Sequence, residues 1–132
     1  MEEKVVYPEL SYEIVGVLYS AHNKLGGYAN EKQYGDYIEN ELKEQKIKYE
    51  REKVLDQYFP EERSGRHRID FLIEDAIILE LKCARILSKE AYYQIQRYLR
   101  ALNKKLGLLV NFRDKYLRPH RILNSQTTIR NS

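Results

Sequence analysis

Three charged side chains lie close together in a stretch where apolar and charged residues alternate. Residues 69–82 are typical of two β-strands joined by a tight turn, with Asp70 on the first strand and Glu80 and Lys82 on the second. Side chains two positions apart on a strand share a face, so Glu80 and Lys82 point to the same side. With the turn at 74–76, Asp70 lies opposite Glu80, with about 5.5 Å between their Cα atoms. The other face is apolar in this alternation and carries Ile69, Phe71, Ile73, Ile77, Leu79 and Leu81.

Two carboxylates and an ammonium group on one sheet face indicate a site for Mg²⁺ or Mn²⁺ beside a positive charge. Such cations take oxygen ligands, commonly one or two carboxylates, with water and substrate phosphate completing the shell. A bound ion polarises a phosphate and acidifies a water molecule, which is the chemistry of phosphodiester cleavage. The alternative is that Asp70 and Glu80 form the polar face of an exposed hairpin, with Lys82 bridging to one of them. Two opposed carboxylates repel each other without a cation or a proton between them, which favours the metal site.

Motifs along nearly the whole chain, from about residue 9 to residue 123, resemble those of a nuclease superfamily. The acid, the hairpin and the Glu-x-Lys pair are similar to the PD-(D/E)xK nuclease superfamily, and the other motifs are similar to its small GxxExxY family. One departure is the family's first glycine, since Tyr28 stands at its position and Gly26 and Gly27 precede it. The further motifs are an opening helix over 9–26, the ExxY of Glu31 to Tyr34, the QxxxY of Gln94 to Tyr98 and a closing LGLLxNF-like strand over 106–112.

The resemblance implies a three-layer α/β fold, in which helices flank a mixed central sheet, and a metal-dependent nuclease that hydrolyses DNA. It implies Mg²⁺, or Mn²⁺, as the cofactor, held by Asp70, Glu80 and the backbone carbonyl of Leu81. Glu31 is implied as a third acid that binds the ion directly or through water. Lys82 is implied as the group that orients the attacking water or stabilises charge on the phosphate. The alternative function is a nucleic-acid-binding or adaptor module that keeps the fold without the chemistry.

Three of the implied site residues also have structural explanations. Gln94 and Tyr98 share one helix face, and the resemblance implies that Gln94 takes part in catalysis and that Tyr98 reaches the nucleic acid. Tyr98 also continues an apolar stripe, so plain packing is its alternative. Glu31, near a helix start, is favoured there by helix electrostatics alone. Tyr34 lies one turn after Glu31 on the same face, and we expect it to support the site from behind or to belong to the core.

The charge of the chain is unevenly distributed. The net charge is only +3, but residues 91–132 hold nine bases and one acid, whereas the first 90 residues hold fourteen bases and nineteen acids. A basic C-terminal third suits a nucleic-acid backbone, because phosphates bind chiefly to Lys and Arg, and we expect DNA rather than RNA. The alternative is a solvated face. The candidates for phosphate contact are Arg97, Arg100, Lys104 and Lys105.

Periodicity and turn signals predict the elements that position these residues. We expect one domain over 1–132, with a core over 9–123 and a polar, frayed tail over 124–132. Pro119 places the last strand at a sheet edge. The helices are expected over 9–25, 31–45 and 89–103, the last capped by Ser88. The strands are expected over 47–55, at an edge, and over 66–74, 76–83, 106–112 and 116–123, with a loop over 56–65.

Other classes of protein lack support in the sequence. No run approaches the roughly 20 apolar residues that span a bilayer, and the N-terminus lacks a signal-peptide pattern, so we expect no membrane association. Cys83 is the only cysteine, which excludes an internal disulfide and favours the cytoplasm. His22, His67 and His120 have no metal-site spacing and receive no role. The chain has no phosphate-binding glycine loop and no serine nucleophile elbow. The twelve tyrosines leave a homodimer open.

Overall fold

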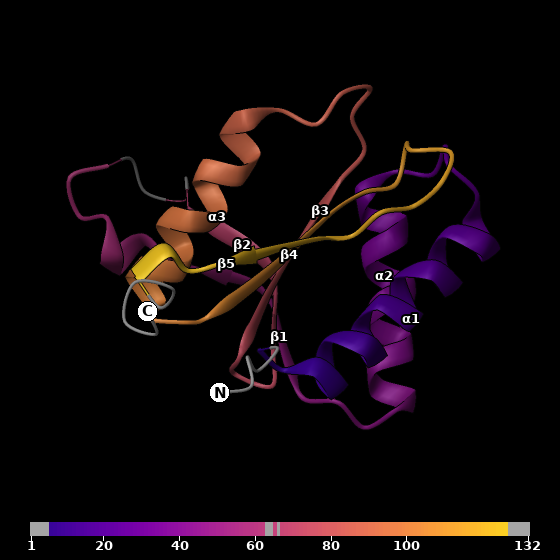
Figure 1. The fold of residues 1–132 in the computed structure, drawn as a ribbon, viewed down its shortest axis with the longest axis horizontal. Helices are drawn as coiled ribbons and strands as arrows, with labels where there is room; N and C mark the ends of the chain where they lie inside the picture. The colour runs from indigo at the N-terminus through magenta and orange to yellow at the C-terminus, as the bar shows by residue number, and fades with distance from the viewer. Residues whose placement is uncertain (1–5, 63–64, 66, 127–132) are drawn as a thin grey trace, which may run out of the picture.

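Helices cover both faces of a single five-stranded sheet (Figure 1). The computed structural model describes residues 6–62, 65 and 67–126. The helices are α1 (Pro8–Leu25), α2 (Glu31–Glu44) and α3 (Lys89–Leu102), with a short 3-10 turn at Asp56–Tyr58. The strands are β1 (Tyr49–Val54), β2 (Arg68–Ile73), β3 (Ile77–Lys82), β4 (Leu106–Asn111) and β5 (His120–Leu123).

The sheet is mixed and follows the order of the chain, β1-β2-β3-β4-β5. β3 and β4 are parallel and are connected through α3, whereas the other neighbours are antiparallel. In Figure 1, α1 and α2 lie on one face of the sheet and α3 lies on the other. The predicted three-layer α/β fold is therefore confirmed.

Two apolar clusters hold the layers together, one on each face of the sheet. The cluster under α1 and α2 includes Phe71 and Leu79, and the cluster under α3 includes Leu72 and Ile78. Ile69 was expected on the same face as Phe71, but it packs in the α3 cluster. The alternation of β2 therefore breaks at Asp70, where the paired strand β1 also bends, since Glu52 has a φ of 54°.

The helices that carry candidate residues begin at defined caps. Asn30 and Gln33 form a reciprocal capping box, so α2 starts at Glu31. Ser88 accepts a hydrogen bond from Ala91 N (3.3 Å), which confirms the predicted start of α3. These caps fix the direction in which each helix leaves its loop.

The C-terminal part of the chain differs from the prediction in two places. β5 is shorter than the predicted strand over 116–123. Leu117 lies in the loop before β5, and its backbone carbonyl accepts a hydrogen bond from Tyr19 Oη (3.1 Å). Asn124, expected in a frayed tail, is buried and donates to Leu99 O (3.2 Å) and Lys104 O (2.9 Å). Residues 127–132 of that tail lie outside the described residues. No helix in the described part of the chain is long and apolar enough to cross a membrane.

Candidate active site

The β2–β3 hairpin places Asp70 beside Glu80. Phe71 pairs with Leu79, so one further step along both strands brings the two acids together. The paired register ends there, because Asp70 Oδ2 accepts a hydrogen bond from Leu81 N (2.7 Å) in place of a strand carbonyl. The carboxylate of Asp70 therefore lies at the point where β2 and β3 separate.

Glu80 is a buried acid whose side chain lacks full compensation. Only 7% of the residue is exposed, and its Oε1 atom is buried with no hydrogen-bond partner. Burial raises the pKa of Glu80 well above its usual value, and the charge of Asp70 raises it further. A buried carboxylate oxygen without a donor is unfavourable unless a proton or a cation meets it. Two adjacent carboxylates of this kind fit a hard divalent cation.

The backbone of Leu81 also faces this point. Phe112 N donates to Lys82 O (2.9 Å), so the peptide groups of Lys82 point toward β4. Because successive residues of a strand direct their peptide groups to opposite edges, the N–H and C=O of Leu81 point toward β2. The N–H meets Asp70, and the carbonyl lies on the same edge as a third possible oxygen ligand.

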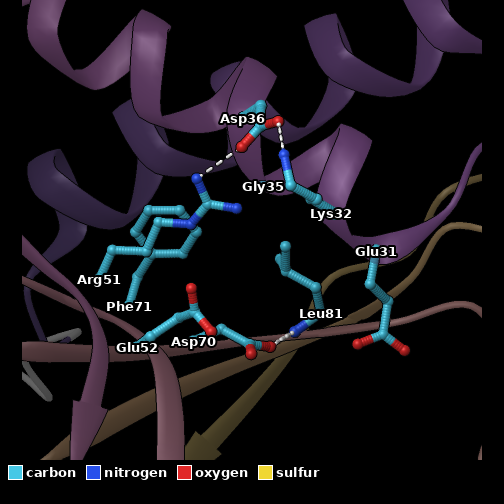
Figure 2. Close-up of a pocket in the computed structure, with 9 residues that line it drawn as sticks. All are labelled: Glu31, Lys32, Gly35, Asp36, Arg51, Glu52, Asp70, Phe71 and Leu81. Carbon is cyan, nitrogen blue, oxygen red and sulfur yellow. Dashed lines mark hydrogen bonds and ion pairs between the residues drawn. The ribbon is translucent and has the colours of Figure 1, made fainter.

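Glu31 lies at the first turn of α2 and approaches the hairpin from the other side of Leu81 (Figure 2). Its pKa is raised by burial and by the charge of Asp70, while Lys82 and a hydrogen bond from the Cys83 backbone lower it. Within the described ranges, no three His, Cys, Asp or Glu side chains gather closely enough to hold a metal. The structure thus brings Asp70 and Glu80 together, and Glu31 does not join them in a group of three metal-ligating side chains in the described part of the chain.

Two clefts flank the end of β3. A cleft of about 550 Å³ on the α2 side is lined by Glu31, Asp70 and Leu81 together with residues of α2 and β1 (Figure 2). A second cleft of about 330 Å³ on the α3 side is lined by Lys82 and Gln94. The candidate site therefore opens on both sides of the sheet.

Lys82 is half-buried and has no ion pair among the described residues. Among the described residues, no carboxylate oxygen lies within 4.0 Å of the Lys82 ammonium group. Lys82 therefore does not form the fixed salt bridge that was the alternative. Its charge nevertheless lowers the pKa values of Glu80 and Glu31, which places it within electrostatic reach of both acids. A cation in this position can act on a phosphate bound beside the acids.

A buried polar network lies under the α3 side of the site. Tyr98 is 2% exposed, and its hydroxyl contacts Gln94 Nε2 and His67 Nδ1, the latter at 3.2 Å. His67 Nε2 contacts Glu62 Oε1 at 2.8 Å. Burial raises the pKa of Tyr98, and the charge of Glu80 contributes, so the network reaches the candidate metal site. The expected contact of Tyr98 with nucleic acid is wrong, because the ring is covered by protein.

His67 is the network member that the sequence did not reveal. It has no metal-site spacing in the sequence, and its partners Glu62 and Tyr98 lie 5 and 31 residues away. No local spacing signals such a contact. Tyr34, in contrast, is in the core as one alternative held: its ring stacks on Phe112 with centroids 4.0 Å apart, and its hydroxyl donates to Gly26 O.

Two of the four predicted phosphate contacts are already engaged with acids. Arg97 Nη2 bonds to Glu62 Oε2 (2.6 Å), and its guanidinium lies 4.8 Å from the ring centroid of Phe59. Lys104 Nζ bonds to Asp75 (3.1 Å) in the turn between β2 and β3. Neither cation is held free for a phosphate.

The position of these bases also separates them from the site. β4 begins beside the first residue of β3 and ends beside Lys82. Lys104 and Lys105 precede β4, and Arg100 lies in the last turn of α3. The two lysines are therefore more than about 17 Å along the strand from Lys82. The bases that do follow the carboxyl ends of β3 and β4 are Arg85, Arg113, Lys115 and Arg118. The last three belong to the basic region over 91–132, which did not distinguish them, and Arg85 lies outside that region.

Comparison with known proteins identifies the family. The sequence model of the PD-(D/E)XK nuclease superfamily matches residues 8–122. No curated protein and no solved structure gives a match. The matched region contains all five strands up to Ile122 and all three helices, and it includes Asp70, Glu80 and Lys82. The chain belongs to the PD-(D/E)XK nuclease superfamily.

Proposed function

We propose that the chain is a metal-dependent nuclease of the GxxExxY family and that it hydrolyses phosphodiester bonds of DNA. The observation that carries this proposal is the unpartnered Oε1 atom of Glu80, buried beside Asp70. A protein without a cation at this point keeps an unfavourable pair of acids. The superfamily membership supplies the reaction class in which such a pair has a use.

The proposed ligands are the carboxylates of Asp70 and Glu80 and the backbone carbonyl of Leu81. A bound Mg²⁺ or Mn²⁺ ion supplies a Lewis acid for the scissile phosphate and lowers the pKa of a water molecule. Glu31, across Leu81 from Asp70, would accept a hydrogen bond from a water molecule at this site and orient it. These oxygen donors suit a hard cation better than a nitrogen- or sulfur-preferring metal.

Lys82 and Gln94 act from the cleft on the α3 side. The ammonium group of Lys82 stabilises the charge that develops on the phosphate, since no carboxylate within ion-pair distance neutralises it in the described residues. Gln94 Nε2 is held by Tyr98 and His67, so its amide is fixed at the wall of that cleft. Gln94 is proposed to position the substrate backbone.

The second candidate function is a nucleic-acid-binding module without chemistry. One observation favours it: the described residues do not assemble a group of three acidic or other metal-ligating side chains. A divalent ion requires only one or two protein carboxylates when water and phosphate complete the shell, so two acids and a carbonyl are sufficient. The nuclease is the better account.

Cleavage of DNA in the presence of a divalent cation tests the proposal. Wild-type protein with Mg²⁺ or Mn²⁺ should degrade or nick single-stranded or plasmid DNA, and EDTA or Asp70→Asn should abolish the activity. Lys82→Ala should lower kcat by about 10²–10³ with KM nearly unchanged, because the lysine acts on charge formed in the transition state. Lys104→Ala, which removes an ion-paired lysine at the opposite end of β3, is the matched control and should remain active.

Two results would contradict the nuclease. In one, wild type and Asp70→Asn preparations cleave equally, so that the activity belongs to a contaminant. In the other, no substrate is cleaved with either cation, and the binding module becomes the better account.

A further inference from the structure

Two exposed tyrosines stand beside cations at the end of the sheet that carries the candidate site. Tyr28, in the loop between α1 and α2, is 88% exposed, and Tyr116, in the loop after β4, is 75% exposed. The guanidinium of Arg113 lies 5.1 Å from the ring centroid of Tyr28, and Lys115 Nζ lies 5.5 Å from that of Tyr116. We call these four residues the strand-end rim.

The loop that carries most of the rim is fixed to the end of β3. Asn111 is buried next to Lys82 in the strand register, and its side chain accepts from Ala84 N (3.0 Å) and Arg113 N (3.3 Å) and donates to Ala84 O (2.7 Å). One amide thus ties the loop after β3 to the loop after β4. Arg113, the first rim residue after β4, is therefore anchored next to the end of β3.

The loop that carries Tyr28 meets the same place from the helical layer. A Cβ atom on Gly27 would lie 3.4 Å from Phe112 O, so this loop packs against the end of β4. Glu31, the acid across Leu81 from Asp70, follows Tyr28 by three residues. In Figure 1 the loop between β4 and β5 reaches the ends of α1 and α2. Tyr28 and Arg113 thus border the side of the site where Glu31 lies.

The two cations of the rim lack acidic partners among the described residues. In the described part of the chain, Arg113 and Lys115 have no ion pair, in contrast to Arg97 and Lys104, which are both bound to acids. A strand phosphate is the complementary charge for cations left in this state. Exposed aromatic rings beside them offer flat faces on which a base can stack.

We propose that the strand-end rim stacks unpaired bases and thereby leads single-stranded nucleic acid into the candidate site. The inference deepens the proposed function, on which it rests, by naming the substrate class. Stacking on a side chain requires a base whose face is free, whereas each base inside a duplex is covered by its neighbours. Because every base has such a face, the rim selects unpaired strands without selecting a sequence.

The test measures binding by fluorescence anisotropy in EDTA, so that no strand is cut. The probes are a labelled single-stranded DNA, an abasic strand of the same length and a blunt duplex. Tyr28→Ala and Tyr116→Ala should each weaken binding of the single strand by about 5- to 150-fold, the value of one base–aromatic stack. Both variants should bind the abasic strand like wild type, and wild type should bind the single strand more tightly than the duplex.

Two controls separate stacking from charge and from general loss of surface. Arg113→Gln should weaken binding of the single strand and of the abasic strand alike, because it removes a positive charge that attracts phosphate. Tyr12→Ala removes a tyrosine that is 80% exposed on α1, remote from the rim in sequence, and should change neither. Thermal unfolding of each variant checks that these exposed substitutions leave the fold intact.

The inference is overturned if both tyrosine variants bind the single strand as tightly as wild type does. It is also overturned if the variants lose as much affinity for the abasic strand as for the single strand. Its failure is distinct from failure of the nuclease. If the tyrosine variants cleave DNA and bind the single strand as wild type does, only the role of the rim is rejected. If binding depends on the tyrosines but the protein cleaves no substrate, the role of the rim is supported and the nuclease function is rejected.

Discussion

Asp70 and Glu80 set two carboxyl groups side by side where β2 and β3 separate, and in the metal-free protein this destabilises the fold. Burial of Glu80 and the nearby charge of Asp70 raise the pKa of Glu80 above its ordinary value of 4.5. The folded state therefore keeps this proton to a higher pH than the unfolded chain does. The stability that results is complete below the ordinary value and is lost as the pH rises through the folded-state pKa.

Glu80→Gln should remove this dependence on pH. In EDTA, the free energy of unfolding of wild type should fall relative to that of the variant as the pH rises, by at most about 1.4 kcal/mol per pH unit for one proton. Above the folded-state pKa of Glu80 the variant should be the more stable protein, because it no longer holds a buried charge beside Asp70. Urea unfolding across the pH range measures the difference. Parallel curves for the two proteins would show that Glu80 ionises normally in the fold.

The pairing of these two acids was predictable from sequence, because a strand period of two and a tight turn determine the register of a hairpin. The contact between Tyr98 and His67 was not predictable, because no sequence pattern shows that a tyrosine of α3 contacts a histidine 31 residues earlier. Tyr98 fitted both the apolar stripe and the family motif. The packing of α3 on the sheet is what buries Tyr98 and brings its hydroxyl into contact with Gln94.

At the level of elements, the approach of α3 to the sheet depends on a glycine in β4. A Cβ atom on Gly107 would lie 2.6 Å from Ile95 Cγ2 and 3.6 Å from Ile78 O. α3 packs closely there, and its start at Ser88 sets the position of Gln94 over the cleft that Lys82 lines. Helix and strand types followed from periodicity, but this close contact depends on tertiary packing that the sequence does not specify.

Gly107→Ala should lower the free energy of unfolding by about 1–3 kcal/mol, because the added methyl group overpacks the contact with Ile95. Gly16→Ala is the matched control. Gly16 lies inside α1 with no atom near the position of an added Cβ, so the substitution should stabilise the protein by about 0.5–1 kcal/mol through helix propensity. Urea unfolding measures both. Equal stability of Gly107→Ala and wild type would be inconsistent with the close packing of α3.

At the scale of the whole molecule, ion pairs engage some basic residues and leave others unpaired in the part of the chain that the structure describes. Arg97 is bound to Glu62, 35 residues earlier, and Lys104 to Asp75, 29 residues earlier. The unpaired Arg113 and the half-buried Lys82 gather instead where β3 and β4 end. The sequence indicated a basic region, but it could not show which bases face the site, since that depends on ion pairs between distant segments.

In the proposed nuclease, the strands that separate at Asp70 and the buried acid without a donor hold a divalent ion. Calorimetric titration of the metal-free protein with Mn²⁺ tests this most directly. Wild type should bind the ion, and Glu9→Gln, which removes an exposed acid in the first turn of α1, should bind it equally. Asp70→Asn and Glu80→Gln should lose the binding while remaining folded. No binding by wild type, or equal binding by Asp70→Asn, would contradict the metal site and with it the proposed chemistry.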